Sequence, residues 1–397
     1  MTTSTTDPLP YLSEHYHRDP YPYYAALRAE QPVYRHPAGF WAITSYDAIR
    51  HLLYDRTLGV ADLDYGPASA LHQSMLGADA PQHTRLRRTH SRWFTPKAVR
   101  DWAEIVRGEV SRRLDVIAES GGRFDAVLDL AFPSTFATIS HLLDIPVCDA
   151  LSVRKATYDL GKGLGLDPTD EDCAAASNAF AWFSQHIEQL VAAKREQPGT
   201  GLLDSFLAFE ADGTMSHEEV VASTTLLFAV GHLDVTYLIV HGMQVMAENP
   251  EVFRTYRDHP DQRDDIVNEI LRIDTPEQFV ARITTQPIEI AGVQIEAGEP
   301  LILFIGAGNR DPEVFEEPDL FRLDRDADLS KHLAFGGGIH GCAGQVLARA
   351  EAHEVFLALT SRFDSLQIDG PVVFNHSEFI RSIATLPIAT TPAQPRH

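Results

Sequence analysis

The sequence predicts a mainly α-helical fold with small β-sheets. Segments whose apolar residues recur with a helical period fill most of the chain between residues 95 and 359. A shorter β-rich region interrupts them at 278–304. Helices and strands do not alternate regularly along the chain, and this order does not favour a doubly wound α/β fold.

In chain order, the first expected elements are a helix over 21–31 and short strands over 32–34 and 40–43. The long helices are expected over 97–120, 174–195, 217–247, 261–274 and 344–362. Three strands are expected between the last two helices, over 278–284, 288–295 and 300–304. The segment 306–331 carries Pro, Asp and Asn with little periodicity, so we expect a long irregular loop. Loops of this length are usually functional.

Charge and composition exclude several classes of protein. The chain has 33 Lys and Arg against 56 Asp and Glu, a net charge of −23. Such a field repels phosphates, so nucleic acid is not an expected partner. No stretch of about 18 apolar residues lacks a charge, and the polar N-terminus does not have the pattern of a signal peptide. The cysteines Cys148, Cys173 and Cys342 are too scattered for a disulfide framework, so we expect a reduced, cytoplasmic protein.

The most informative segment is the glycine-rich stretch HLAFGGGIHGCAGQ, which runs over residues 332–345. Gly336, Gly338 and Gly341 match a dinucleotide-binding fingerprint, but the long buried strand that should precede it is missing. A second hypothesis is a zinc site, although the paired ligand spacing of structural zinc sites is absent. The potential ligands would be His332, His340, Cys342 and His353.

A third hypothesis is that the glycines let the backbone pass close to a large flat cofactor while Cys342 offers a thiolate to its metal. The cysteine comes directly before an expected helix, where backbone N–H groups stabilise an anion. The simpler alternative is a buried free cysteine beside ordinary turns, which is common in proteins.

Residues 335–344 (FGGGIHGCAG) resemble the haem-binding signature of cytochromes P450, Phe-Gly-x-Gly-x-His/Arg-x-Cys-x-Gly. Four other segments resemble further motifs of this family in the family's order: DAPQHTRLRR from Asp79, GHLD from Gly231, EILR from Glu269 and NRDP from Asn309. The resemblance extends over most of the chain and is to the soluble bacterial branch. It implies a single domain over 1–397, with loose tails at 1–14 and 390–397.

The resemblance implies that haem b lies between the long central helix and the cysteine loop, with Cys342 as the axial iron ligand. Phe335 would pack near the sulfur, and Gly336 and Gly344 would belong to the haem-binding loop. Cationic side chains at family positions would pair with the two haem propionates. These side chains are His83, Arg87, Arg282 and His340.

Glu269 and Arg272 resemble the family's structural Glu-x-x-Arg pair, although the same spacing also suits an ordinary helical ion pair. The family's third partner is an arginine in the following loop. Leu320 occupies the position matched to it, and Arg322 lies two residues further along. We therefore leave the third partner open.

The segment GHLDVT, which begins at Gly231, departs from the family's oxygen-activation motif, Ala/Gly-Gly-x-Asp/Glu-Thr. Asp234 matches the acid, but His232 replaces the second glycine and Val235 replaces the threonine that delivers protons. Valine has no hydroxyl group and cannot pass a proton. Thr236 lies one residue further, about 100° around the helix, so it is not a simple substitute.

Four consequences are open. Water held by His232 and Asp234 delivers protons, a group on the substrate joins the relay, or the reaction is an oxidative coupling that needs less proton delivery. In the fourth, His232 reaches the iron as a sixth ligand in the resting state. Most buried histidines are simply hydrogen-bonded. A register shifted by one residue, with Leu233 on the acid position, lacks the threonine as well.

A basic segment is a candidate docking surface for a redox partner. Between residues 79 and 101 the chain carries six cations and no acid: Arg85, Arg87, Arg88, Arg92, Lys97 and Arg100. A solvated helix face is the simpler interpretation. By resemblance, this segment flanks the haem and binds an acidic ferredoxin. We expect electrons from NAD(P)H to arrive through a separate ferredoxin and ferredoxin reductase.

Aromatic residues in the segments that face the substrate in this family indicate a mid-sized organic substrate. They are Tyr65, Trp182, Phe228, Phe279 and Phe379. Any one of them is more often plain core than pocket.

The expected function is that of a haem-thiolate monooxygenase in secondary-metabolite biosynthesis, acting as a monomer away from membranes. One alternative is oxidative coupling that forms a C–C, C–N or C–O bond without oxygen insertion. An alternative of a different class is a non-catalytic protein that binds haem or a nucleotide with the glycine loop.

Overall fold

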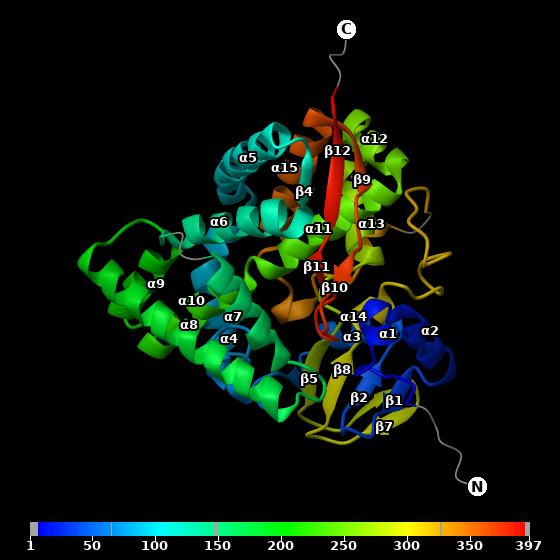
Figure 1. Ribbon diagram of the computed structural model, residues 1–397. Coiled ribbons are helices and arrows are strands. Elements are labelled where there is room, and N and C mark those ends of the chain that lie inside the picture. The colour runs from blue at the N-terminus through cyan, green and yellow to red at the C-terminus, as the bar shows by residue number, and fades with distance from the viewer. Residues whose placement is uncertain (1–6, 65, 147–149, 326–327, 394–397) are drawn as a thin grey trace.

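The computed structural model describes residues 7–64, 66–146, 150–325 and 328–393 (Figure 1). Helices make up most of it, with small sheets beside them, so the predicted fold class is confirmed. Figure 1 shows α11 (Leu233–Glu248) in the middle of the molecule, between α6 (Phe132–Leu143) and α13 (Arg263–Ile273). Tyr65, one of the expected pocket residues, and Cys148 lie outside the described residues.

The expected helices are present with small shifts at their ends. They are α2 (Tyr21–Glu30), α5 (Pro96–Glu119), α8 (Asp170–Glu196), α13 and α15 (Gln345–Arg362). Side-chain caps fix several starts: Thr169 and Asp172 form a reciprocal capping box at the start of α8. The helix expected over 217–247 is in fact two helices, α10 (His217–Val230) and α11, because the helix is interrupted at Gly231 and His232.

The other helices complete the helical part of the fold. They are α1 (Glu14–Arg18), α3 (Tyr46–Tyr54), α4 (Gln82–Ser91), α6, α7 (Ala150–Lys162), α9 (Leu202–Ala211), α12 (Pro250–Asp258) and α14 (Ile305–Gly308). A π-helical turn over Ala126–Ala131 precedes α6.

The largest sheet joins the N-terminal region to the β-rich region predicted at 278–304. Its strand order is β1 (Val33–Arg35), β2 (Trp41–Ile43), β8 (Pro300–Leu303), β5 (Val280–Thr284) and β3 (Leu58–Gly59). The strand expected over 288–295 is a hairpin, β6 (Ile288–Ile290) and β7 (Val293–Ile295). It turns at Ala291 and Gly292, which both have positive φ.

A second sheet uses the C-terminal region, for which the sequence predicted no strands. Its order is β4 (Arg123–Asp125), β12 (Pro387–Pro392) and β9 (Phe363–Ile368). A separate two-stranded sheet pairs β10 (Val373–Phe374) with β11 (Ile383–Thr385). Both strands come between β9 and β12 in the chain. Together they place the C-terminal segment against the central helices.

The expected loose tails at 1–14 and 390–397 are wrong in part. Leu9 is 0% exposed and Tyr11 is 5% exposed, because both pack in a cluster with α1 and α2. At the other end, β12 pairs through Thr391 with Ser365, so the sheet includes residues up to 392. Apolar burial and strand pairing therefore order parts of both segments.

Two stretches, Ala126–Leu143 and His217–Glu248, are long and apolar enough by composition to cross a membrane. In each, 78% of the apolar window is buried inside the fold. Apolar residues on all sides are expected of helices in the core of a large fold.

Candidate active site around Cys342

The cysteine loop is held by backbone contacts that require glycine. Gly336 and Gly338 have φ of +63° and +64°, which side chains other than glycine rarely adopt. A Cβ atom on Gly338 would also collide with the carbonyl oxygen of Leu53 at the end of α3. The Cys342 amide donates a hydrogen bond to the Phe335 carbonyl (2.9 Å). This turn places Cys342 just before Gly344, the N-cap of α15.

The Cys342 side chain is exposed to the open space beside it, although it lies deep within the fold. Burial raises the pKa of its thiol to about 11, and the carboxylates of Asp234 and Glu277 also raise it. The Gly344 amide and the charge of Arg87 act in the opposite direction. A metal cation supplies the positive charge that such a thiolate needs, since coordination deprotonates a thiol outright.

The four predicted propionate partners are brought together from three separate parts of the chain. The rings of His83 in α4 and His340 in the cysteine loop lie 4.4 Å apart. Both nitrogens of His83 and Nε2 of His340 have no hydrogen-bond partner among the described residues. Burial and the charges of Arg282, His83 and Arg87 lower the pKa of His340 to about 3.

These groups form a largely buried cationic cluster, and Asp79 is the acid beside it, 3.9 Å from His340 Nε2. Burial lowers the pKa of Arg87, and the charge of the Cys342 side chain acts in the opposite direction. Arg282 is only 8% exposed on β5. Its Nη1 donates to the Ala281 carbonyl, whereas the unpartnered nitrogens of His83 and His340 are buried polar atoms of the kind that normally has a hydrogen-bond partner. Two carboxylates of one cofactor beside an accessible cysteine would provide such partners, so the residues present fit haem.

The break between α10 and α11 exposes a glycine in an otherwise buried segment. Gly231 is exposed although its neighbours Ala229 and His232 are both 0% exposed. Asp234 lies one turn further, with an Oδ1 that is buried and has no hydrogen-bond partner among the described residues. Burial raises the pKa of Asp234 to about 6. We call the surroundings of the exposed Cys342, where the charges of Asp234 and Arg87 act on its thiol and the histidine cluster adjoins Arg87, the cysteine-facing hollow.

Three other residues of this segment face elsewhere. The ring of His232 packs edge-on against Phe132 and Phe136, with ring centroids 5.5 and 5.7 Å away, and burial lowers its pKa to about 4. The Thr236 hydroxyl donates to the carbonyl of His232 at 2.7 Å, and Val235 packs in the main core cluster. Ligation of iron by His232 would therefore require the ring to leave its aromatic neighbours.

Sequence reasoning missed Glu277, which contributes to the same hollow. It lies between α13 and β5, and its backbone pairs with Ile380 in an isolated bridge. Burial, followed by the charge of Asp234, raises the pKa of Glu277 to about 8. The sequence analysis took the neighbouring Phe279 as a pocket residue. No periodicity in this short segment shows which side chains face inward.

Glu269 and Arg272 form a fully buried ion pair at the end of α13. Arg272 donates to both carboxylate oxygens, at 2.6 and 2.8 Å, and neither side chain is exposed. Arg272 also donates to the carbonyls of Asn309, Pro318 and Leu320. The pair therefore fixes the irregular segment expected at 306–331.

The third partner of this pair is Arg325, which the sequence analysis did not identify. Its Nε donates to Glu269 Oε1 at 3.1 Å, and its side chain is 2% exposed. Arg322 contributes only its backbone amide to Glu269, at 2.9 Å, while its side chain binds Glu317 and Asp324. We call Glu269, Arg272 and Arg325 the Glu269 network.

The expected pocket aromatics lie in two different core clusters. Phe228 is 0% exposed and packs against Phe136 and Phe183, and Trp182 packs on Phe183. Phe279 is 4% exposed and packs against Phe379, at 5.3 Å. Their role in substrate binding stays a prediction.

The basic segment is partly used inside the fold. Arg85 forms an ion pair with Glu219 of α10, and Arg92 donates to the Ser205 hydroxyl. Four of its cations are exposed, among them Arg92: the others are Arg88, Lys97 and Arg100.

The side chains of the zinc hypothesis do not converge. His353 bonds Tyr256 and Asp264, whereas His332 contacts Arg349. Within the described part of the chain, no group of three His, Cys, Asp or Glu side chains is placed to hold a metal ion.

Comparisons with known proteins agree with this geometry. Residues 263–385 match the family model described as Cytochrome P450. The chain is 33% identical to "Cytochrome P450 monooxygenase PikC" of Streptomyces venezuelae, over 95% of this chain and 92% of that protein. It is 30% identical to "Nocardicin C N-oxygenase" of Nocardia uniformis subsp. tsuyamanensis, over 93% and 95%. The solved structure of epothilone B-bound Cytochrome P450epoK superposes with a TM-score of 0.88 at 26% identity, covering 96% of this chain and 99% of that one.

Proposed function

The chain belongs to the cytochrome P450 family, and we propose that Cys342 holds haem b in the cysteine-facing hollow for the oxidation of a mid-sized organic molecule. It is an oxidoreductase related to bacterial monooxygenases of secondary metabolism. One observation carries the assignment to this site. An accessible cysteine just before α15 lies beside a cationic cluster in which both nitrogens of His83 and Nε2 of His340 have no hydrogen-bond partner among the described residues.

Each part of the hollow has a proposed role. Haem ligated by a thiolate activates dioxygen and favours cleavage of its O–O bond. Gly336 and Gly338 let the loop approach the cofactor, and the Gly344 amide stabilises the sulfur anion. His83, Arg87, Arg282 and His340 bind the propionates.

We assign proton transfer to Asp234. Its Oδ1 has no partner, and its pKa of about 6 leaves both protonation states accessible near neutral pH. Val235 lies in the core and has no hydroxyl to contribute. His232 and Thr236 would have a structural role: their hydrogen bond would fix the break before α11 that exposes Gly231.

Cytochromes P450 of this kind require electrons from redox partners. We propose an acidic ferredoxin, reduced by NAD(P)H through a ferredoxin reductase, and Arg88, Lys97 and Arg100 as part of its docking surface. We further propose that one domain spans residues 1–397 and acts as a cytoplasmic monomer. The comparisons do not favour oxidative coupling or a non-catalytic binding protein over monooxygenation.

The experiment is the carbon monoxide difference spectrum of the reduced, haem-loaded protein. The wild type should give a strongly red-shifted Soret band, and Cys342→Ala should lose it. Cys173→Ala in α8 is the matched control and should keep it. A wild-type protein that never takes up haem would overturn the assignment. A nucleotide-binding loop would instead keep its ligand in Cys342→Ala.

A further inference from the structure

Arg381, which lies between β10 and β11, joins three other parts of the chain. Its backbone amide donates to the Pro276 carbonyl at 2.7 Å, and its own carbonyl accepts from Nε2 of His241 in α11 at 3.0 Å. Its side-chain Nε donates to the carboxylate of Asp274, the residue that ends α13. One residue therefore ties α11, the end of α13 and the chain before β5 together.

The side chains that hold Arg381 are largely buried and contact one another. Nδ1 of His241 lies 3.0 Å from Oδ2 of Asp274, and the Tyr21 hydroxyl of α2 donates to Oδ1 of Asp274 at 2.9 Å. The side chains of His241, Asp274 and Arg381 are 0%, 15% and 10% exposed. Burial alone would raise the pKa of Asp274, but the charges of Arg381 and His241 hold it below its usual range. Hydrogen bonds to an ionised carboxylate are strong. We call His241, Asp274 and Arg381 the Arg381 clamp.

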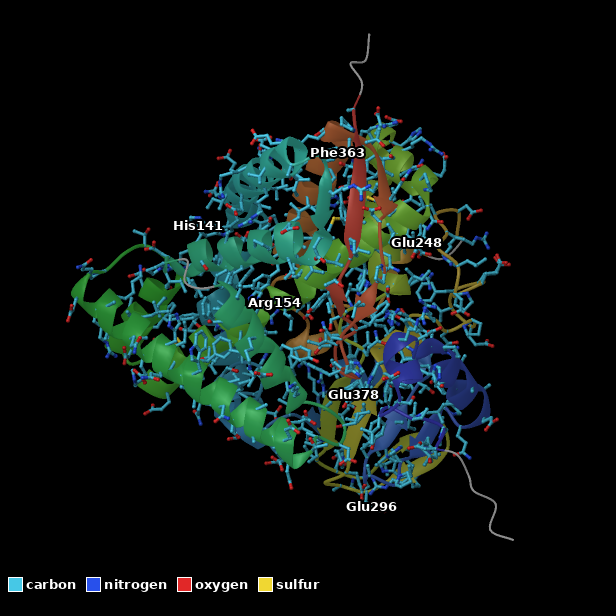
Figure 2. The ribbon with its side chains drawn as sticks, in the orientation of Figure 1. His141, Arg154, Glu248, Glu296, Phe363 and Glu378 are labelled. Atoms are coloured by element: carbon cyan, nitrogen blue, oxygen red, sulfur yellow. The ribbon has the colours of Figure 1, made fainter. Side chains whose placement is uncertain are left out.

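His241 lies on the same face of the central helix as Asp234. The two residues are seven apart, which is close to two helical turns, so their side chains leave α11 in nearly the same direction. Figure 2 labels Glu248, the last residue of this helix, seven residues beyond His241. A contact that holds His241 therefore fixes the rotation of α11 about its axis, and with it the direction of the Asp234 carboxylate.

The chain on either side of Arg381 also fixes the approach to β5. Residues 277–278 pair with residues 379–380 through a backbone bridge and a backbone hydrogen bond of 2.8 Å. Strand β5 begins two residues later and carries Arg282, a predicted propionate partner. The clamp thus connects the helix of Asp234 to the strand of Arg282 through backbone pairing and buried polar contacts.

We propose that His241 is a positioning residue of the cysteine-facing hollow, which holds α11 and the chain before β5 in one fixed arrangement around the cofactor. This inference rests on the proposed function, because Asp234 and Arg282 have their roles there only with haem bound. Without the imidazole, the Arg381 carbonyl and the Asp274 carboxylate each lose a contact in the core. The two elements are then free to shift relative to one another. A purely structural contact would instead lower stability without changing the space beside the iron.

The test uses two ligands that bind haem iron through the same kind of nitrogen but differ in size, imidazole and 4-phenylimidazole. Their dissociation constants are measured by Soret-band titration of haem-loaded wild type, His241→Ala, His241→Gln and His353→Ala. His353 is the matched control, because its ring also contacts a carboxylate, Asp264 at 2.9 Å, and a second polar group, the Tyr256 hydroxyl at 2.7 Å. These contacts join α15 to α12 and α13 and involve no residue of the Arg381 clamp.

His241→Ala should weaken binding of 4-phenylimidazole about three- to tenfold and of imidazole less than about twofold, since only the larger ligand needs both elements in place. His241→Gln, whose amide can still donate to the Arg381 carbonyl, should recover part of this loss. His353→Ala should lower the unfolding midpoint as His241→Ala does, but keep the ratio of the two dissociation constants. An unchanged ratio in His241→Ala, or an equal change in His353→Ala, would overturn the positioning role.

A milder variant keeps the test decisive if His241→Ala does not fold. Tyr21→Phe removes only the hydroxyl that donates to Asp274, so it should change the ratio in the same direction by a smaller factor. A ratio equal to that of wild type in Tyr21→Phe would then count against the clamp. The carbon monoxide spectrum of the wild type tests the proposed function separately, because it reports the thiolate ligand and not the arrangement of α11 and β5.

Discussion

The Glu269 network and the cysteine-facing hollow both bury charged side chains, but only one of them satisfies these charges internally. Glu269 accepts hydrogen bonds from two arginine side chains and from one backbone amide. Arg272 donates further hydrogen bonds to three backbone carbonyls. In the hollow, Asp234, His83 and His340 each retain a polar atom without a partner. Complete pairing is expected of a structural group, whereas polar atoms without partners beside an exposed cysteine leave contacts for a bound group.

The largest effect on the free energy of unfolding should come from a substitution in the Glu269 network. Glu269→Ala leaves Arg272 and Arg325 buried without an anion, at a cost of about 3–5 kcal/mol in the free energy of unfolding. The measurement is urea unfolding followed by circular dichroism, with Cys173→Ala as a neutral control. A loss below about 1 kcal/mol would show that the network is not the structural element that its geometry indicates.

The contrast between the two regions also separates what the sequence could predict from what it could not. The spacing of Glu269 and Arg272 on one helix is local, and the structure has this pair as predicted. Arg325 lies in an irregular segment, where no period assigns side chains to a face, so sequence reasoning stopped at Arg322. The same limit hid Glu277, which precedes a strand by three residues.

The central helix shows a different limit. His232 and Thr236 are four residues apart and lie on one face, where the Thr236 hydroxyl donates to the His232 carbonyl. The sequence did not show that this face packs on α6 rather than on the cysteine side. It also did not show the break that exposes Gly231, because a single apolar pattern runs through both helices.

The second prediction tests Arg325 against its neighbour. Arg325→Ala removes a buried charged hydrogen bond to Glu269 and should cost about 1.5–3 kcal/mol of unfolding free energy. Arg322→Ala removes only ion pairs to exposed acids and keeps its backbone amide, so it should cost below about 1 kcal/mol. Equal losses in matched urea titrations would contradict the assignment of Arg325 as the third partner.

The third prediction concerns pH and the hollow. Glu277 has a folded pKa of about 8, whereas a glutamate in the unfolded chain titrates near pH 4.3. The unfolded chain therefore releases this proton first, and the contribution of Glu277 to stability falls as pH rises from about 5 to about 8. Glu277→Gln cannot titrate, so its advantage over wild type should grow across this window.

Unfolding midpoints of wild type and Glu277→Gln at intervals between pH 5 and pH 9 measure this difference. The proteins are compared in their haem-loaded form. A difference that stays constant across the window would mean that Glu277 is ionised throughout and already has a partner.

The smallest effect is expected from a substitution of Val235, which packs in the core but adjoins an acid of the cysteine-facing hollow. Its side chain is 8% exposed in the core, next in sequence to the unsatisfied Asp234. If proton delivery limits this enzyme, Val235→Thr supplies the missing hydroxyl and should lower the hydrogen peroxide released per NADPH consumed by a few-fold. Val235→Ala, which changes the volume without adding a hydroxyl, is the control.

The added hydroxyl of Val235→Thr also disturbs packing in the core, so the unfolding midpoint of each variant is measured as well. Unchanged peroxide release in a well-folded Val235→Thr would mean that Asp234 and its solvent already supply protons without a hydroxyl at this position.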